Sequence, residues 1–307
     1  MRHLCQHDAG NLPSHAATWL ARHTLLGSIE FASLWETLGG KPVCWTVYDD
    51  DRPVALFTGV QFGRGRFARF QAMPDGLYSR LQCLEDVNRD ESIRLVMEGL
   101  ASAGYARIFI NDFHNQCGEC QGFERSDCAT RLVDVSPDDW HPPDSKLRSE
   151  IRKALREDTP IRDFSLNRHF GAFLELMNRT EQRHGRHPKY SPDFYRALGK
   201  LAMIDQRVRW IVCEQGDRLA ASHIYFVEND MLLNWQVFFD KQFSALKPNQ
   251  LITFSLVNEL ALRGIRVLNL GSSPDIAVSL ADYKAKWGGE LYHYPCLSRR
   301  SWIGRML

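Results

Sequence analysis

WTVYDDDRPVA (residues 45–55) and WIVCEQGDRLA (residues 210–220) align with each other without a gap. Both copies begin with a tryptophan, Trp45 and Trp210, and both alternate apolar with other residues on either side of a turn that carries acidic residues or glycine. This pattern predicts a strand, a tight turn and a second strand in each copy. We therefore expect the same hairpin twice in the chain.

A second pair of similar segments occurs in the same order. LASAGYARIFIN (residues 100–111) resembles LALRGIRVLNL (residues 260–270), and the two pairs are separated by nearly the same number of residues. Each copy predicts the end of a helix, a stop at Gly104 or Gly264, and a strand. Hairpins and helix-to-strand turns are common elements, but their repetition in one order favours two similar domains in tandem.

The boundary between these domains is indicated by composition. The stretch VSPDDWHPPDS (residues 135–145) is rich in proline and aspartate, as exposed connections are. We expect an N-terminal domain at residues 1–135, a linker at 136–145 and a C-terminal domain at 146–307. Within each domain the patterns predict helices, three or four antiparallel strands, a further helix and a final strand, which is the order of the α+β class.

The overall composition limits the partners of the chain. It has 307 residues, of which 44% are hydrophobic and 24% charged, as in globular proteins. The formal net charge is +1, so any contact with nucleic acid has to be local. Residues 1–20 lack the apolar core of a signal peptide, and no window is apolar enough for a membrane span. We expect a cytoplasmic protein whose eight cysteines are reduced thiols.

Motifs of several other chemistries are absent or weak. The chain has no G-x-S-x-G, H-E-x-x-H or P-loop sequence, which excludes serine hydrolases of that type, zincins and P-loop enzymes. FGRGRF (residues 62–67) precedes strand-like residues and favours a hairpin turn over a phosphate loop. His114, Cys117, Cys120 and Cys128 have ligand types that suit zinc, but a single C-x-x-C favours plain thiols, and we expect no metal.

Three segments of the second half resemble one family of enzymes. LRSEIRKALRE (residues 147–157) is similar to the opening of that family's second domain, and LMNRTEQRHG (residues 176–185) to its T-x-x-R-x-G segment. LNLGSS and ADYKAKWGG (within residues 268–289) are similar to its closing F-K-x-x-[FW]-G pattern. The segments resemble FemAB-type enzymes of the GNAT acyltransferase superfamily. The resemblance implies two tandem GNAT-like domains, each a mixed, mostly antiparallel sheet flanked by helices.

The resemblance also implies a reaction. It indicates an N-acyltransferase that moves an acyl or aminoacyl group from an activated carrier to a primary amine of a small molecule or a peptidoglycan-like cell-envelope precursor. The carrier is acyl-CoA or aminoacyl-tRNA, with no tightly bound cofactor. The loop FSALKPNQLITFSL (residues 243–256) has no glycine to cradle a pyrophosphate, which slightly favours aminoacyl-tRNA. The alternative is a non-catalytic GNAT-like module that binds a small ligand or peptide.

Lys284 is the residue that we expect to act in catalysis, because an ammonium can stabilise the oxyanion at a reacting carbonyl. In the alternative, Lys284 and Lys286 form the solvated face of a plain strand whose other face carries Tyr283 and Trp287. The resemblance implies further residues. Those expected to bind the donor are Tyr283, Asn249, Gln250, Arg152 and Arg156. Those expected to bind the acceptor are Arg183, His184, Tyr190, Trp235 and Gln236.

Some of these residues also suit purely structural roles. Arg152 and Arg156 recur on one face of the helix predicted near residues 146–157, and a solvated helix face shows the same pattern. Trp235 suits a core position as well as a pocket wall. Asn249 is a good N-cap for the helix predicted to begin near Pro248, where the helix N-terminus offers donors to an anion.

Overall fold

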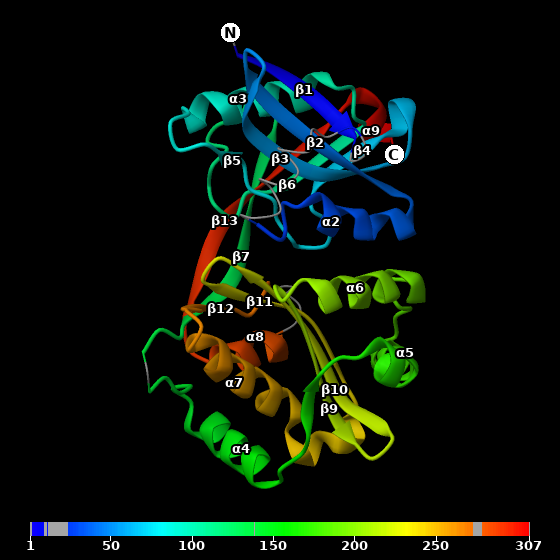
Figure 1. Cartoon of the computed structure of the whole chain (residues 1–307), viewed down its shortest axis with the longest axis vertical. Coiled ribbons are helices and arrows are strands. Elements are labelled where there is room, and N and C mark those ends of the chain that lie inside the picture. The colour runs from blue at the N-terminus through cyan, green and yellow to red at the C-terminus, as the bar shows by residue number, and fades with distance from the viewer. Residues whose placement is uncertain (1, 9–10, 12–23, 138, 273–277, 307) are drawn as a thin grey trace. The chain divides into compact units, whose positions relative to one another are not determined.

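The chain folds into two compact units, which we describe separately (Figure 1). The computed structural model describes residues 2–8, 11, 24–137, 139–272 and 278–306. Unit 1 contains residues 1–128 and 293–307, and unit 2 contains residues 129–292. The division therefore differs from the expected one, since the residues from His293 onward belong to the first unit.

Unit 1 is a sheet with the strand order β1-β2-β3-β4-β6-β13, in which the last strand is β13 (Glu290–Arg300), and β5 pairs with β3. Its elements are β1 (Arg2–Asp8), α2 (Ile29–Ala32), η2 (Ser33–Leu38), β2 (Gly40–Asp49), β3 (Arg52–Phe62), η3 (Gly65–Phe67), β4 (Arg69–Ala72), β5 (Gln82–Cys83), α3 (Arg89–Ser102), β6 (Arg107–Asn111) and α9 (Trp302–Met306). The strand β4 is parallel to β6, and the other pairs are antiparallel.

Unit 2 is a sheet with the strand order β7-β12-β11-β10-β9-β8, in which the first strand is β7 (Glu124–Asp134). Its elements are α4 (Ser145–Arg156), β8 (Ile161–Asp163), α5 (Leu166–Arg183), α6 (Pro192–Ile204), β9 (Val208–Gln215), β10 (Arg218–Glu228), β11 (Met231–Phe239), η4 (Lys241–Leu246), α7 (Pro248–Ala261), β12 (Val267–Asn269) and α8 (Val278–Ala285). The strand β11 is parallel to β12, and the other pairs are antiparallel.

The repeat predicted from the sequence is confirmed element by element. The strands β2 and β3 form one antiparallel hairpin, and β9 and β10 form the other. Asp50 and Gly216 adopt positive φ in the two turns, at 52° and 58°. Each hairpin is followed by a strand, a helix and a strand parallel to the first, namely β4–α3–β6 and β11–α7–β12. The mixed, mostly antiparallel α+β fold is therefore present twice.

Two strands pass from one unit into the other along the chain. The strand β7 (Glu124–Asp134) begins in unit 1, and its residues 132–134 pair with β12 in unit 2. The strand β13 (Glu290–Arg300) begins in unit 2, and its residues 296–300 pair with β6 in unit 1. Each repeat thus receives its last strand from the end of the other repeat. Local sequence patterns carry no signal of this exchange, because they do not specify partners distant in sequence.

The expectation that all eight cysteines are reduced thiols is wrong for one pair. Cys128 of β7 and Cys296 of β13 form a disulfide within unit 1, with their Cα atoms 6.0 Å apart. They are 168 residues apart in the sequence. Only the return of β13 to unit 1 brings the two thiols together, so composition and spacing could not indicate the bond.

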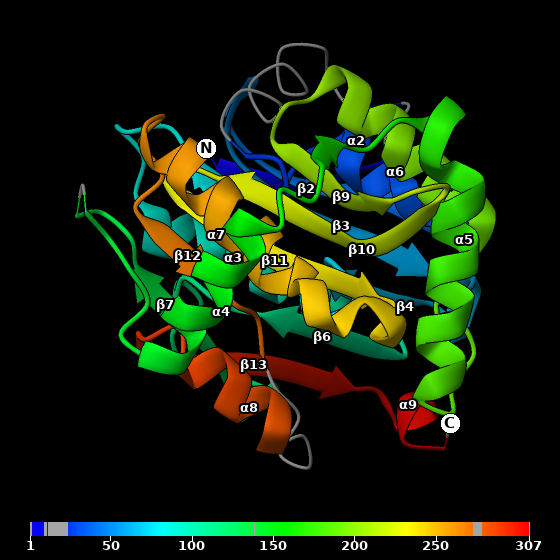
Figure 2. The same cartoon turned by 90° about the horizontal axis from the view of Figure 1, so that it is seen from below.

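Each unit has its own apolar core. In unit 1, α3 packs its buried face against the hairpin β2–β3 and β6, with Trp45 and Val96 in this core. In unit 2, α4 and α7 cover the sheet, and Leu256 and Leu268 lie in that core. Unit 2 is seen best from below, with α4, α7 and α8 around its strands (Figure 2). None of the described helices combines the length and apolar character that a bilayer crossing requires.

Candidate functional site

The parallel strands β11 and β12 of unit 2 separate part of the way along β11. They pair through Met231, Leu232 and Leu233, and the register ends at Leu233 and Asn269, where β12 stops. The strand β11 continues to Phe239. The other side of β11 is irregular, because Tyr225 is paired with Asn234 and Ile224 with Gln236, so that Trp235 forms a bulge. Bulges leave a residue outside the ladder and are common next to active sites.

The turn after β12 lies beside this opening. Asn269 accepts a hydrogen bond from the hydroxyl of Thr130 at 2.6 Å and another from the backbone N–H of Gly271 at 2.8 Å, which fix the turn. Gly271 has φ of 72°, and a Cβ on it would lie 3.3 Å from the carbonyl oxygen of Asn234 on β11. Glycine is therefore required for the close approach of the two strand ends. The amide of Asn269 has a structural role here that needs no carboxylate.

Lys284 reaches this turn from α8. Its ammonium donates to the carbonyl oxygens of Gly271 at 3.0 Å and Ser272 at 2.7 Å. The side chain is buried, with 8% of the residue exposed. Burial, and secondarily the charge of Arg131, lowers the pKa of Lys284 from 10.5 to about 8. At neutral pH the lysine is therefore protonated, and the described residues accept two of its three hydrogens.

The stretch around Lys284 is a helix, so the alternative of a strand with a solvated basic face is wrong. Lys284 is buried although its neighbour Lys286 is only partly so, and the alternation expected of a strand is absent. Trp287 is fully buried and stacks on Trp140 at 6.3 Å. After it, Gly288 and Gly289 adopt positive φ values of 89° and 72°. The helix is set by tertiary burial, which the local alternation did not reveal.

The N-terminus of α7 lies in the same unit and is occupied by side chains. Lys247 is at the N-cap with φ of 55°, and its ammonium donates to Glu150 of α4 at 2.9 Å. Gln250 donates to the other carboxylate oxygen of Glu150 at 3.1 Å. The carboxylate therefore lies where helix N-termini attract anions. Glu150 was not among the predicted residues, because in the sequence it is a single acidic residue between Arg148 and Arg152 of a basic helix.

Asn249 does not cap α7, and this part of the prediction is wrong. Its side-chain oxygen instead accepts from Nε2 of His223 on β10 at 2.9 Å. On the other side of the ring, Tyr225 hydrogen-bonds Nδ1 at 2.9 Å, and Thr253 contacts the same phenol at 2.9 Å. Burial lowers the pKa of His223 to about 4, so the imidazole is neutral at physiological pH. A lone histidine in an apolar strand gave no signal of this network.

The remaining residues expected at the donor lie on two helices. Tyr283 is on α8, partly buried, and contacts Trp287 edge-on at 6.4 Å between ring centroids. Arg152 and Arg156 are exposed on α4, and no ion pair or hydrogen bond joins either of them to a described residue. Of the predicted donor set, the structure brings Asn249 and Gln250 together at the start of α7, but both are engaged with protein partners.

Four of the five residues expected at the acceptor lie on β11 or contact it. Trp235 contacts Tyr190 at 5.5 Å between ring centroids, and Gln236 accepts a hydrogen bond from Tyr195 of α6 at 2.9 Å. Arg183 lies farther along, where it donates to the carbonyl oxygen of Phe239 at 2.9 Å. His184 follows it as an exposed residue at the end of α5. Arg183, Tyr190, Trp235 and Gln236 thus follow one strand, with Trp235 and Gln236 at the bulge.

The cysteine loop of unit 1 contains no metal ligand set. Cys128 is in the disulfide, and Cys120 donates to the carbonyl oxygen of Cys117 at 2.9 Å. Burial raises the pKa of the Cys117 thiol, and burial also lowers the pKa of His114 to about 4. Within the described ranges no cluster of three His, Cys, Asp or Glu side chains suits a metal ion.

Comparisons with known proteins identify the fold. Residues 144–285 match the family model described as the acetyltransferase (GNAT) domain. The structure of FemX is similar with a TM-score of 0.73 and 10% sequence identity, over 95% of this chain and 96% of that one. L-PGS from Bacillus licheniformis gives a TM-score of 0.60 at 14% identity, over 90% of each chain. No curated protein matches the sequence of this chain.

A third structure shows the same tandem arrangement. The tandem GNAT protein from the clavulanic acid biosynthesis pathway is similar with a TM-score of 0.54 and 12% identity, over 97% of this chain and 98% of that one. At these identities the structures establish the shared fold, and the family match lies on the half that contains Lys284. Residues 144–285 thus match the acetyltransferase (GNAT) domain, and the chain as a whole has the tandem fold also seen in FemX and in the tandem GNAT protein.

Proposed function

We propose that unit 2 transfers an acyl or aminoacyl group from an activated carrier to a primary amine, at the opening between β11 and β12. The observation that carries this proposal is the buried, protonated Lys284 at the end of that opening, beside Gly271. Burying a charged lysine is costly unless its hydrogens find acceptors. Two carbonyl oxygens accept from it, and the third hydrogen can be donated to a reacting carbonyl.

The proposed reaction needs no side-chain nucleophile. The neutral amine attacks the carbonyl carbon, a C–N bond forms, and the C–O or C–S bond to the carrier breaks. The oxyanion that develops on the carbonyl oxygen is stabilised by the Lys284 ammonium, which keeps its proton throughout. The proton lost by the amine goes to the leaving oxygen or sulfur. Holding the two reactants together in the opening supplies a further part of the rate.

The N-terminus of α7 favours aminoacyl-tRNA over acyl-CoA as the donor. A CoA pyrophosphate bound at a helix N-terminus needs free backbone N–H groups and no competing negative charge. Here the first helical residue is Pro248, which has no N–H, and the carboxylate of Glu150 is held by Lys247 and Gln250. Glu150 would repel a pyrophosphate at that place. An aminoacyl ester on a tRNA 3′-end carries no pyrophosphate.

The acceptor is proposed to lie along β11. Trp235, which packs on the buried ring of Tyr190, provides apolar ring surface, and Gln236, held by Tyr195, provides an amide for hydrogen bonding. Arg183 and His184 at the far end of the strand could meet a carboxylate of the acceptor. These groups suit an amine of a small molecule or of a peptidoglycan-like precursor, and the proposed donor places the reaction in the cytoplasm.

The donor assignment is tested by transfer assays with the whole chain. Radiolabelled aminoacyl-tRNA pools, acetyl-CoA and a long-chain acyl-CoA are each supplied with a panel of amines, and the labelled product is counted. We expect transfer from charged tRNA and none from acyl-CoA. Glu150→Gln should remove the repulsion and strengthen acyl-CoA binding by about three- to tenfold. Glu157→Gln, at the end of the same helix, is the matched control.

Two results would contradict the donor proposal. One is efficient transfer from acyl-CoA by the unaltered protein. The other is an equal response of acyl-CoA binding to Glu150→Gln and Glu157→Gln, which would show that the position of the charge is immaterial. With either donor, Lys284→Met distinguishes enzymatic transfer from spontaneous hydrolysis of the carrier. Formation of the labelled product should depend on Lys284, whereas spontaneous hydrolysis should not.

A further inference from the structure

Unit 1 carries a basic surface that the transfer reaction does not use. It consists of residues 62–72, 105–109 and 298–306, which we call the arginine surface. These segments contain seven arginines and no aspartate or glutamate, although the whole chain has 38 basic and 37 acidic residues. The concentration of one charge is therefore local. The segments include the FGRGRF stretch at residues 62–67, which forms the turn between β3 and β4.

The three segments form one continuous region. The backbone N–H of Ala106 donates to Ala68 at 2.7 Å, and that of Ser301 donates to Ala106 at 3.0 Å. The guanidinium of Arg107 donates to the carbonyl oxygen of Gly304 in α9 at 3.3 Å. The short helix α9 also contacts η3. Chain segments far apart in sequence thus place their arginines and apolar side chains side by side.

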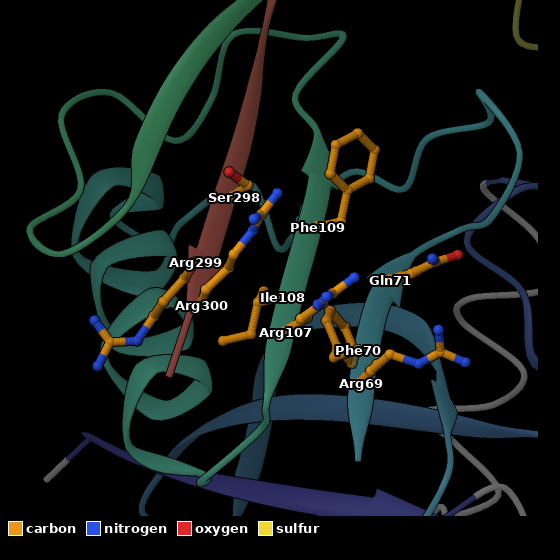
Figure 3. Close-up of a pocket in the computed structure, with 9 residues that line it drawn as sticks. All are labelled: Arg69, Phe70, Gln71, Arg107, Ile108, Phe109, Ser298, Arg299 and Arg300. Carbon is orange, nitrogen blue, oxygen red and sulfur yellow. The ribbon is translucent and has the colours of Figure 1, made fainter. Parts of the chain in front are cut away.

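Three of the arginines are arranged in a row across the sheet. Arg69 of β4 is paired with Arg107 of β6, and Arg107 is paired with Arg300 of β13. Gln71, Phe109 and Ser298 are paired in a second row on the same face of the sheet. All six line a pocket of about 220 Å³ (Figure 3). Like charges directly opposite each other destabilise a sheet. None of the three forms an ion pair with a described carboxylate, so an external anion would relieve their repulsion.

The same surface exposes large apolar side chains. Phe67 is 47% exposed, Phe109 39%, Trp302 72% and Met306 69%. All the other strongly exposed large hydrophobic residues described in the chain belong to unit 2. Trp302 and Met306 are four residues apart on α9 and therefore share one face of it. Unit 1 thus concentrates its exposed apolar groups where it concentrates its arginines.

We propose that the arginine surface docks on a bilayer surface that carries anionic phospholipids. The arginines attract the lipid phosphates, and Trp302, Met306 and Phe67 enter the interfacial region, where tryptophan is enriched. A membrane is favoured over RNA because the two most exposed groups, Trp302 and Met306, lie on one helix face and Met306 cannot stack on a base. The docking is peripheral and does not depend on the proposed transfer reaction.

Vesicle co-sedimentation of the whole protein tests the proposal. We expect binding to vesicles of phosphatidylcholine with phosphatidylglycerol, no binding to phosphatidylcholine alone, and weakening by salt. The double variant Arg69→Gln/Arg300→Gln should lower the partition coefficient by on the order of tenfold or more. Trp302→Gln should lower it as well, without a change in net charge.

Matched controls address charge and hydrophobicity separately. Arg94→Gln removes one positive charge of unit 1 outside the arginine surface, where Arg94 forms an ion pair with Glu98. Leu262→Gln removes an apolar side chain of unit 2 that is 91% exposed. Both should bind vesicles as the unaltered protein does. Absence of binding to anionic vesicles, or equal losses in the controls, would overturn the proposal. Unchanged vesicle binding with loss of binding to total tRNA in the arginine double variant would instead assign the surface to RNA.

Discussion

The helices α3 of unit 1 and α7 of unit 2 occupy matching places in the two repeats, but their N-termini differ. In unit 1, α3 starts at Asn88, whose side chain accepts from the N–H of Glu91, and two acidic residues occupy its first turn. In unit 2, α7 starts at Lys247, has no acid in its first turn and receives Glu150 from α4 instead. The N-terminus of α3 is thus capped by its own residues, whereas that of α7 receives a carboxylate from another helix.

The parallel strand pairs β4–β6 and β11–β12 also differ, in how far along the strands the pairing extends. The strand β4 pairs with β6 up to its last residue, Ala72. The strand β11 pairs with β12 for three residues and then continues past the bulge at Trp235. An opened sheet exposes backbone groups and a gap that a substrate can enter, while a closed one provides a surface. We therefore propose that the two copies of one fold have different uses, transfer in unit 2 and docking in unit 1.

The largest effect is expected from Lys284→Met. Removing one oxyanion donor costs roughly 10²–10³-fold in turnover, or about 3–4 kcal/mol. The fold should persist, because methionine suits a buried position on α8. Turnover with the preferred donor measures the loss, and circular dichroism checks the fold. Lys286→Met is the control and should remain near the normal rate. Equal activity of the two variants would show that unit 2 does not use this lysine.

The strand exchange is tested by reducing the disulfide in unit 1. Breaking Cys128–Cys296 should lower the free energy of unfolding by about 2–4 kcal/mol, because the bond closes a long loop in the unfolded chain. Urea denaturation with and without a reductant measures this difference. The double variant Cys128→Ser/Cys296→Ser should show no response to reductant. Titration of eight free thiols in the unfolded, unreduced protein would contradict the bond.

The pH dependence of turnover sharpens the assignment of Lys284. Its pKa of about 8 means that the lysine is protonated below pH 8 and loses its proton above it. The rate should therefore fall about tenfold per pH unit well above pH 8, as the oxyanion donor loses its charge. A pH–rate profile at saturating donor measures this limb. In Lys284→Arg the limb should move to higher pH, since arginine stays charged. An unmoved limb would assign it to another group.

The smallest expected effect is a difference in the free energy of unfolding between variants of the two matched tryptophans, Trp45 and Trp210. Trp210 donates its indole N–H to Ser222 at 2.8 Å, whereas the indole N–H of Trp45 has no partner among the described residues. Trp210→Phe should therefore cost about 1 kcal/mol more in free energy of unfolding than Trp45→Phe. Urea titrations of both variants give the difference. If adding Ser222→Ala to Trp210→Phe recovers the extra cost, the lost hydrogen bond is its cause, because the unpaired Ser222 hydroxyl is then removed as well. Equal costs of the two tryptophan variants would exclude this cause.

Candidate residues could be named from the sequence, but their arrangement could not. Lys284 was selected from its local motif, and Gln236 and Trp235 from the family resemblance; Lys284 lies on α8, and the other two lie at the bulge of β11. Asn249 was expected to cap its own helix, yet it binds His223. Glu150 received no role because its partners, Lys247 and Gln250, are about a hundred residues away. Side-chain pairing across such separations has no local periodicity.

The sequence by itself determined the repeated hairpins, the helix-to-strand order and the glycine turns, because hydrophobic alternation and glycine φ preferences act within a few residues. Tertiary structure alone decided the exchange of β7 and β13, the disulfide that it permits, and the burial of Lys284. It also decided the row formed by Arg69, Arg107 and Arg300. Strand partners are chosen by the packing of the complete sheet, so residues that meet across strands are fixed only when the whole chain has folded.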